Sequence, residues 1–263
     1  MALSSLGNAL QEVGRFDEAI IAGQIVLPAM TDFISFPFYD LLQENGHVPE
    51  IRKKLPPLLA GVRQSILEIG AGTGLITTSL ADWTPAEIFA LEPSAGMRAV
   101  LLSRLSSRPE LLKRVTVLPC DALSVDLDEP VEAMVMINVM YALEPDYRKR
   151  LWPVLAAQLA PAGLLVFTWR AGGPPPPHPL QEMVSRQVGR HTYAVLSEIL
   201  ESDGEACRAR YLYRVTEGQK VISEEEITGF AYRPVWDVIH RELVSAGFTQ
   251  TEGAERLLAW RLA

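Results

Sequence analysis

The residues best suited to chemistry form the run LEIGAGTG at positions 67–74. Gly70, Gly72 and Gly74 occupy alternate positions directly after an apolar stretch that ends at Ile69. Glycine has no Cβ, so it permits a sharp turn and lets the backbone approach a ligand closely. Where such a loop joins a buried strand to a helix, the amides at the helix start face the ligand. Taken alone, the run would also fit an ordinary tight turn.

Two acidic residues follow this loop at informative distances. Glu92 ends the next apolar stretch, about twenty residues after the loop, where a carboxylate can accept both ribose hydroxyls of a nucleoside. Asp121, in LPCDA, follows a third apolar stretch and is placed to meet an adenine rim. Open α/β sheets bind ligands at the carboxyl ends of their strands. We therefore expect a nucleoside-containing cofactor at this edge.

Short apolar strands alternate with helices from Ser65 onward, which predicts a parallel α/β sheet. The expected strands are 65–69, 87–91, 115–118, 132–138 and 163–168. The expected helices are 74–82, 95–106, 146–160 and 235–246, and two closing strands follow around FTQTE and RLLAWRLA. Because the connections of a parallel sheet are right-handed, few topologies are possible.

The segments outside this alternation are less regular. Residues 1–24 resemble one helical hairpin of a tetratricopeptide repeat, and one repeat cannot bury its own face. A helix pair packed on the domain is therefore favoured over the remnant of a longer repeat array, and a protein partner at these helices is the weaker expectation. Two further helices are expected around YDLLQE and PEIRKKLPPLL. After the proline run at 174–177, we expect a helix over 178–201 and a hairpin over 208–232.

Composition excludes several classes of protein. Of the 263 residues, 48% are hydrophobic, and the net charge of −8 disfavours DNA, RNA and anionic membranes as partners. No apolar run approaches the about twenty residues that a spanning helix needs, and the first residues lack a secretory pattern. Cys120 and Cys207 lie far apart, so we expect no disulfide framework, no metal site and a cytoplasmic location.

The ordered run LEIGAGTG, ALEPSAGM, LPCDA, AMVMINVMYAL and LAPAGLLVFTW resembles the class I S-adenosylmethionine-dependent methyltransferases of the small-molecule type. The resemblance implies a Rossmann-like seven-stranded sheet with helices on both faces and an antiparallel last strand. It also implies an enzyme that moves the methyl group of S-adenosyl-L-methionine to an O, N or C atom of a small molecule. The implied division is 1–38 for N-terminal helices, 39–170 for the cofactor domain, 171–232 for a lid inserted after the fifth strand over the substrate site, and 233–263 for the end of the domain.

The resemblance carries cofactor roles to matching positions. Around the methionine part it places the first motif, with Glu68, Gly70, Ala71, Gly72, Thr73 and Gly74. Glu92 matches the ribose-binding acid, with Pro93, Ser94 and Met97 beside the adenosine. Cys120, Asp121 and Ala122 match the adenine side, and Asn138 and Val139 face the sulfonium. Tyr39 resembles the tyrosine that often closes over the cofactor.

The chain departs from the family just after the fourth strand. Many small-molecule members carry one or two histidines there, whereas this chain has Met140-Tyr141-Ala142, so the catalytic residue is unknown. Tyr141, Trp169, Arg170 and His178 are expected to contact the methyl acceptor. All four histidines lie outside any motif, where a lone histidine is more often at the surface or structural. His178 and His191 are better candidates than His47 and His240, because the insertion that holds them should cover the substrate.

Two other functions stay open at this point. A nicotinamide dehydrogenase also combines a glycine loop with an acid, but its usual spacing is GxGxxG. The second alternative is a protein of the same fold that binds S-adenosylmethionine without methylating anything, such as a cyclase or an interaction module, since fold does not fix function.

Overall fold

The computed structural model describes residues 36–44 and 46–263, so the hairpin expected at 1–24 lies outside the described residues. Two helices come first, α2 (Phe36–Gln43) and α3 (Val48–Leu58). They confirm the helices expected around YDLLQE and PEIRKKLPPLL. Within the described residues, no helix combines the length and the apolar composition needed to cross a membrane.

A seven-stranded sheet forms the centre of the molecule. Its strands are β1 (Ser65–Ile69), β2 (Glu87–Leu91), β3 (Val115–Leu118), β4 (Val131–Met136), β5 (Leu159–Thr168), β10 (Phe248–Ala254) and β11 (Leu257–Leu262), in the order β10-β11-β5-β4-β1-β2-β3. β11 runs antiparallel to both of its neighbours, as the resemblance implies. The dinucleotide-binding order 3-2-1-4-5-6 has no such inserted strand, so the topology argues against the dehydrogenase alternative.

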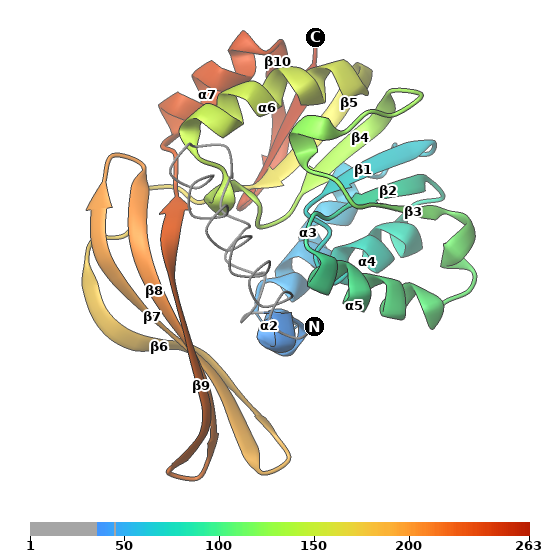
Figure 1. Cartoon of the computed structure of the whole chain (residues 1–263). Coiled ribbons are helices and arrows are strands. Elements are labelled where there is room, and N and C mark those ends of the chain that lie inside the picture. The colour runs from blue at the N-terminus through green and yellow to red at the C-terminus, as the bar shows by residue number, and fades with distance from the viewer. Residues whose placement is uncertain (1–35, 45) are drawn as a thin grey trace, which may run out of the picture.

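Helices cover both faces of this sheet (Figure 1). One hydrophobic core joins α3, α4 (Leu75–Trp83) and α5 (Ala95–Ser106) to the sheet. The other core joins α6 (Pro145–Gln158) and α7 (Trp236–Ser245) to the opposite face. Three short 3-10 helices occupy connections: η1 (Leu111–Lys113), η2 (Ala122–Ser124) and η3 (Met140–Ala142).

The central strands are mostly apolar because both of their faces are buried. In β1, Ile66 belongs to the core under α3–α5, whereas Leu67 and Ile69 belong to the core under α6 and α7. A strand buried on both faces reads as a continuous hydrophobic run. This explains why the bounds of β1 and β2 agree with those expected from the sequence, and the bounds of the edge strand β3 agree as well.

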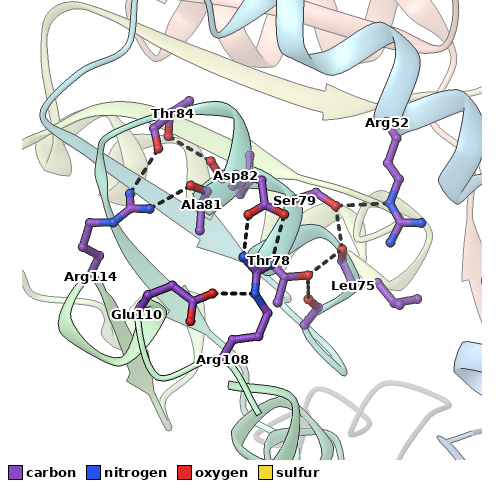
Figure 2. A network of polar contacts seen from close by, with 12 residues as sticks. Arg52, Leu75, Thr78, Ser79, Ala81, Asp82, Thr84, Arg108, Glu110 and Arg114 are labelled. Atoms are coloured by element: carbon purple, nitrogen blue, oxygen red, sulfur yellow. Dashed lines mark hydrogen bonds and ion pairs between the residues drawn. The ribbon is translucent and has the colours of Figure 1, made fainter. Parts of the chain in front are cut away.

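Three arginines from other elements fix α4 behind the glycine loop (Figure 2). The Arg114 guanidinium donates to the carbonyl oxygens of Ala81 and Thr84, at 2.8 and 3.1 Å, and so satisfies acceptors that the helix end leaves open. Arg108 donates to both carboxylate oxygens of Asp82, at 2.8 and 3.0 Å. Arg52 of α3 donates to the Ser79 hydroxyl at 3.2 Å.

A second, four-stranded antiparallel sheet is inserted between β5 and α7. Its strands are β6 (His178–Val188), β7 (His191–Asp203), β8 (Ala206–Glu217) and β9 (Lys220–Tyr232), paired in that order. The predicted hairpin over 208–232 is confirmed, but the predicted helix over 178–201 is wrong. Val195, Ser197 and Ile199 of β7 are buried at alternate positions, which is the period of a strand. Gly189, with φ +60°, makes the turn between β6 and β7.

The inner face of the β6–β9 sheet packs against α2. Phe38 and Leu42 of α2 are buried against Val195 and Tyr213. The Phe38 ring lies 5.5 Å from the Tyr213 ring, centroid to centroid. The β6–β9 sheet therefore supports the helix that comes just before the Rossmann-like domain.

The other attachment of the β6–β9 sheet is a buried ion cluster formed by Arg148, Glu205 and Glu242. Arg148 of α6 is fully buried and donates to Glu242 of α7 at 2.7 Å and to Glu205, in the β7–β8 turn, at 3.0 Å. The Trp152 indole also donates to Glu242, at 2.9 Å. This cluster connects α6, α7 and the inserted sheet through one guanidinium.

Candidate functional site

The glycine loop adopts a backbone that only glycine accommodates without strain. Gly70, Gly72 and Gly74 have φ angles of +71°, +57° and +83°. The Gly70 amide donates to the Leu91 carbonyl at 2.8 Å, which holds the loop against the end of β2. A Cβ added to Gly70 would lie 2.7 Å from Cγ2 of Val139, just beyond β4. The loop is thus fixed between the carboxyl ends of β2 and β4.

Glu92 connects the glycine loop to the start of α5. Its Oε2 accepts the Gly72 amide at 2.8 Å, and its Oε1 accepts the Ser94 amide at 2.8 Å. The Ser94 hydroxyl caps α5 by accepting the Met97 amide at 3.3 Å. Glu92 is buried, and Pro93 follows it directly. The acid expected from the sequence therefore lies beside the loop, held by two backbone N–H groups.

Helix α2 covers the same loop. The Tyr39 ring lies 3.9 Å from the position of a Cβ on Gly72. Asp40 accepts hydrogen bonds from the Thr73 hydroxyl and from Arg104, and Arg104 also donates to the Thr73 carbonyl at 2.9 Å. Burial, with Asp40 and Glu92 nearby, raises the pKa of Tyr39 to about 12. Tyr39 consequently faces the loop as a neutral hydrogen-bond donor.

Glu68, on β1 directly before the loop, is a buried acid with an incomplete set of partners. It is 2% exposed, and within the described residues its Oε2 has no hydrogen-bond partner. Burial raises the pKa of Glu68 to about 8, the Thr77 hydroxyl lowers it, and Glu92 raises it further. A buried carboxyl oxygen without a partner favours a ligand that brings a donor or a positive charge.

The end of β3 is held in place by the Asp121 side chain. Its Oδ1 accepts the Leu123 amide at 2.8 Å, and its Oδ2 accepts the Tyr147 hydroxyl at 2.8 Å. Cys120 is half-buried and Ala122 is buried beside it. β3 is the direct neighbour of β2, so these residues lie at the same edge as Glu92.

Asn138, just after β4, has a strained backbone and meets a histidine that sequence reasoning set aside. Its φ is +58°, and its amide donates to the Thr168 hydroxyl at 2.7 Å. Its side-chain amide lies against the imidazole of His47, 3.2 Å from Nδ1. His47 directly precedes α3, and burial together with Arg170 lowers its pKa to about 4. The structure thus places a neutral imidazole at this edge, from a position that no motif marks.

Tyr141, in η3, lies among other tyrosines. Burial raises the pKa of Tyr141, and Tyr39, Tyr211 and Tyr213 raise it further. Two of these neighbours, Tyr211 and Tyr213, come from β8 of the inserted sheet. Tyr141 therefore lies near α2 and the inserted sheet.

The other three predicted acceptor residues occupy different surroundings. The Trp169 indole donates to the Pro234 carbonyl at 2.9 Å and packs against Trp236, with ring centroids 5.8 Å apart. His178 begins β6, and its Nδ1 lies 2.9 Å from the Pro179 carbonyl oxygen. Arg170 is exposed where the chain leaves β5 and, as its effect on the pKa of His47 shows, is near that imidazole.

Comparison with known proteins agrees with this geometry. Residues 66–163 match the family model described as a methyltransferase domain. An uncharacterised methyltransferase of Mycobacterium tuberculosis is 29% identical over 123 residues, or 45% of this chain and 46% of that protein. A Mycobacterium bovis protein with the same description matches equally well. The chain spans about half the length of the curated relatives it matches.

Three solved structures share the fold. The CcbJ methyltransferase of Streptomyces caelestis aligns with a TM-score of 0.73 and 16% identity, over 90% of this chain and 99% of that one. CalS10, an amino pentose methyltransferase from Micromonospora echinaspora, gives 0.66 and 18%, over 82% and 90%. The sugar N-methyltransferase KedS8 from Streptoalloteichus gives 0.63 and 18%, over 82% and 87%.

Proposed function

We propose that this chain, which carries a class I methyltransferase domain over residues 66–163, transfers the methyl group of S-adenosylmethionine to an O, N or C atom of a small molecule. The main support for this proposal is that the glycine loop, Glu92 and Tyr39 meet at one edge of the seven-stranded sheet. The neighbours with this fold include an amino pentose methyltransferase and a sugar N-methyltransferase, which supports a small acceptor.

The residues at this edge fit the proposed cofactor. The loop brings bare backbone to the surface at Gly72, where a Cβ would approach the Tyr39 ring. Each oxygen of the Glu92 carboxylate accepts one backbone N–H, and a carboxylate oxygen can accept a second donor such as a ribose hydroxyl. Oε2 of Glu68, buried without a hydrogen-bond partner among the described residues, suits the positive charges of the methionine part.

The remaining predicted residues complete this proposal. Pro93, Ser94 and Met97 would lie along the adenosine, with Cys120, Asp121 and Ala122 at the adenine. Ala71, Thr73 and Gly74 complete the loop. Asn138 and Val139 would face the sulfonium, because both lie directly beyond β4 and Val139 packs on Gly70.

Methyl transfer depends here on positioning. The cofactor supplies an activated methyl group on a sulfonium, so alignment of the nucleophile provides much of the acceleration. Tyr39 and Tyr141, both neutral because their pKa values are raised, would orient the acceptor as hydrogen-bond donors. His47 is neutral at physiological pH, and its ring would hold the Asn138 side-chain amide in place at this edge. The inserted sheet would act as a lid that limits water over this site.

The proposal extends to the location of the protein in the cell and to partners other than the methyl acceptor. Both cysteines are unpaired, which supports a reducing, cytoplasmic location. The net charge of −8 argues against nucleic acid as substrate. A protein partner at the N-terminal helices concerns residues outside the described part of the chain. Among the described residues, no group of three or more His, Cys, Asp or Glu side chains is placed to hold a metal ion.

Calorimetry with S-adenosylmethionine tests the binding step. Glu92→Ala should weaken binding by about 1–3 kcal/mol, the cost of losing hydrogen bonds to a charged group. Glu87→Ala is the matched control, because Glu87 lies exposed at the opposite end of the same strand and should leave the affinity unchanged.

Incubation with isotopically labelled S-adenosylmethionine and small-molecule extracts tests the transfer step. A labelled product that Glu92→Ala loses would support the proposal. Tight binding without any labelled product would favour the non-methylating alternative. Absence of S-adenosylmethionine binding in the unaltered protein would overturn the cofactor assignment itself.

A further inference from the structure

We propose that Arg170 and Arg233 together bind an anionic group of the methyl acceptor, a carboxylate or a phosphate. That the bound molecule is a methyl acceptor rests on the proposed function. Binding of an anion to the two arginines can be tested without any methyl transfer. It assigns a chemical class to a substrate that the sequence leaves unnamed.

The two arginines are brought together where the chain enters and leaves the inserted sheet. Arg170 follows β5, and Arg233 follows β9. The hydrogen bond from the Trp169 indole to the Pro234 carbonyl, 2.9 Å long, holds the entering and the leaving segment of the chain side by side. The Arg233 backbone amide donates to the Glu205 carbonyl at 2.7 Å, which fixes the segment that leaves the inserted sheet. The pair therefore has a rigid base at the root of the proposed lid.

Within the described residues, neither guanidinium has a hydrogen bond or an ion pair with a carboxylate or a carbonyl. The neighbouring acids are already engaged. Glu205 pairs with the buried Arg148 at 3.0 Å, and Glu50 lies 3.7 Å from Arg256. Arg170 is exposed and Arg233 is half-buried, so an incoming anion can reach both. The charge of Arg233 acts on Arg170, and the hydrogen bond between their chain neighbours Trp169 and Pro234 keeps the two residues near one another.

Other groups around the pair respond to the same positive charge. Desolvation and the like charges of Arg233 and Arg256 lower the pKa of Arg170. Arg170 also helps to lower the pKa of His47, although Glu50 acts in the opposite direction. Burial and Cys207 raise the pKa of Tyr211, and both arginines oppose this rise. The positive field thus extends from the lid root to the edge where Asn138 meets His47.

The positions of Arg170 and Arg233 suit the binding of an anionic group on the methyl acceptor. Guanidinium groups bind carboxylate and phosphate oxygens through paired N–H donors, so two of them can hold one oxyanion firmly. An acceptor anchored at Arg170 and Arg233 would extend toward Tyr211 and Tyr141, and from there toward the glycine loop. The anion would then set the orientation of the acceptor at the methyl group.

Titration of the full chain with inorganic pyrophosphate and, separately, with benzoate tests the site. The readout is the indole N–H signal of Trp169 in nitrogen-15 NMR, assigned with Trp169→Phe, at ionic strength held constant with chloride. Saturable shifts are expected, and Arg170→Gln/Arg233→Gln should weaken binding by about tenfold or more. The doubly substituted Lys variant should recover part of the loss, because lysine keeps the charge without the fork.

The control is Arg208→Gln/Arg214→Gln, which removes the same charge from arginines paired with Glu201 and Glu224. Unchanged binding in the control supports the site, and the better of the two probes distinguishes phosphate from carboxylate. No saturable shift with either probe, or equal loss in the control, overturns the proposal. S-adenosylmethionine calorimetry on the same samples reports the proposed function separately.

Discussion

Gly70 and Gly72 show how one substitution can meet two different surroundings. An alanine Cβ at Gly70 would lie 2.7 Å from Val139, whereas at Gly72 the nearest atom is 3.9 Å away. Gly70→Ala should therefore add a steric clash to backbone strain and destabilise the fold by about 2–4 kcal/mol. Gly72→Ala carries the strain alone, about 1–2 kcal/mol, but should weaken S-adenosylmethionine binding more than it weakens folding.

Urea unfolding and calorimetry on both variants measure the two effects. Gly172→Ala is the control, because its φ is +91° and an added Cβ would meet no atom within 4 Å. Gly172→Ala should lower the free energy of unfolding through backbone strain, without any change in cofactor affinity. Equal affinity in Gly72→Ala and Gly172→Ala would mean that the loop does not contact the cofactor.

Glu68 gives a pH dependence whose sign follows from its raised pKa. The folded protein retains the Glu68 proton up to a pKa of about 8, whereas the unfolded chain releases it near the ordinary glutamate pKa of 4.5. Between these values the folded state binds more protons, so its stability falls as pH rises and levels off above about 8. Glu68→Gln should remove a loss on the order of 5 kcal/mol between these limits.

Unfolding midpoints of the ligand-free protein at mildly acidic and mildly alkaline pH check this dependence. The exposed Glu129→Gln variant should keep the pH dependence of the unaltered protein. Saturating S-adenosylmethionine should reduce the loss as well, because a positive charge near Glu68 favours its ionised form. An identical pH dependence in Glu68→Gln would show that Glu68 is not the group responsible.

At the scale of the elements, the Arg148 cluster holds the inserted sheet to α6 and α7. Removing a buried guanidinium leaves Glu205 and Glu242 close together without their counter-ion. Arg148→Ala should therefore destabilise the protein by about 3–5 kcal/mol, measured by urea unfolding. Lys149→Ala is the neighbouring control, since the exposed pair with Asp146 contributes less than about 1 kcal/mol. Losses of similar size in the two variants would contradict the role assigned to Arg148.

The elements also show what sequence can and cannot predict. β1 and β2 were predictable because strands buried on both faces leave nearly continuous apolar runs between turn residues. β6 and β7 were missed because their outer faces carry long polar side chains that also suit a helix. The ion pair of Glu198 with Arg210 of β8, 2.6 Å long, supports the sheet, but it becomes visible only once the register is known.

Within the site, motif residues were predictable and long-range partners were not. Glu92 and Gly72 meet as expected because each ends or follows a strand of the same sheet edge. His47 reaches Asn138 across 91 positions of the chain, and the Trp169 indole meets the Pro234 carbonyl only because the insertion returns to its starting point. Neither of these long-range pairings leaves a local pattern in the sequence.

At the scale of the whole molecule, the two sheets have separate cores, and α2 lies between them. Within the described residues, neither core of the seven-stranded sheet includes a residue of the β6–β9 sheet. Phe38 and Leu42, however, are buried against the β6–β9 sheet, while Tyr39 of the same helix covers Gly72. Support for the cofactor edge therefore passes through α2.

This arrangement predicts the outcome of replacing residues 171–232 with a short linker. About six Gly and Ser residues suffice, because the chain segments that enter and leave the inserted sheet lie side by side. The seven-stranded sheet should still fold cooperatively, as circular dichroism and urea unfolding would report. Methyl transfer should be lost with the proposed acceptor surface. Cofactor affinity should fall by roughly threefold to thirtyfold, or about 0.7–2 kcal/mol, because α2 loses its apolar partners.

Point variants separate the loss of α2 support from the loss of the acceptor surface. Tyr213→Ala removes a ring that packs on Phe38, so cofactor affinity should fall in the same direction as in the replacement. Val221→Ala, at an exposed position of β9, should leave it unchanged. If the replacement protein binds S-adenosylmethionine as tightly as the full chain, α2 does not depend on the inserted sheet. If it also still transfers methyl groups, that sheet is no lid, and the acceptor must bind to the seven-stranded domain alone.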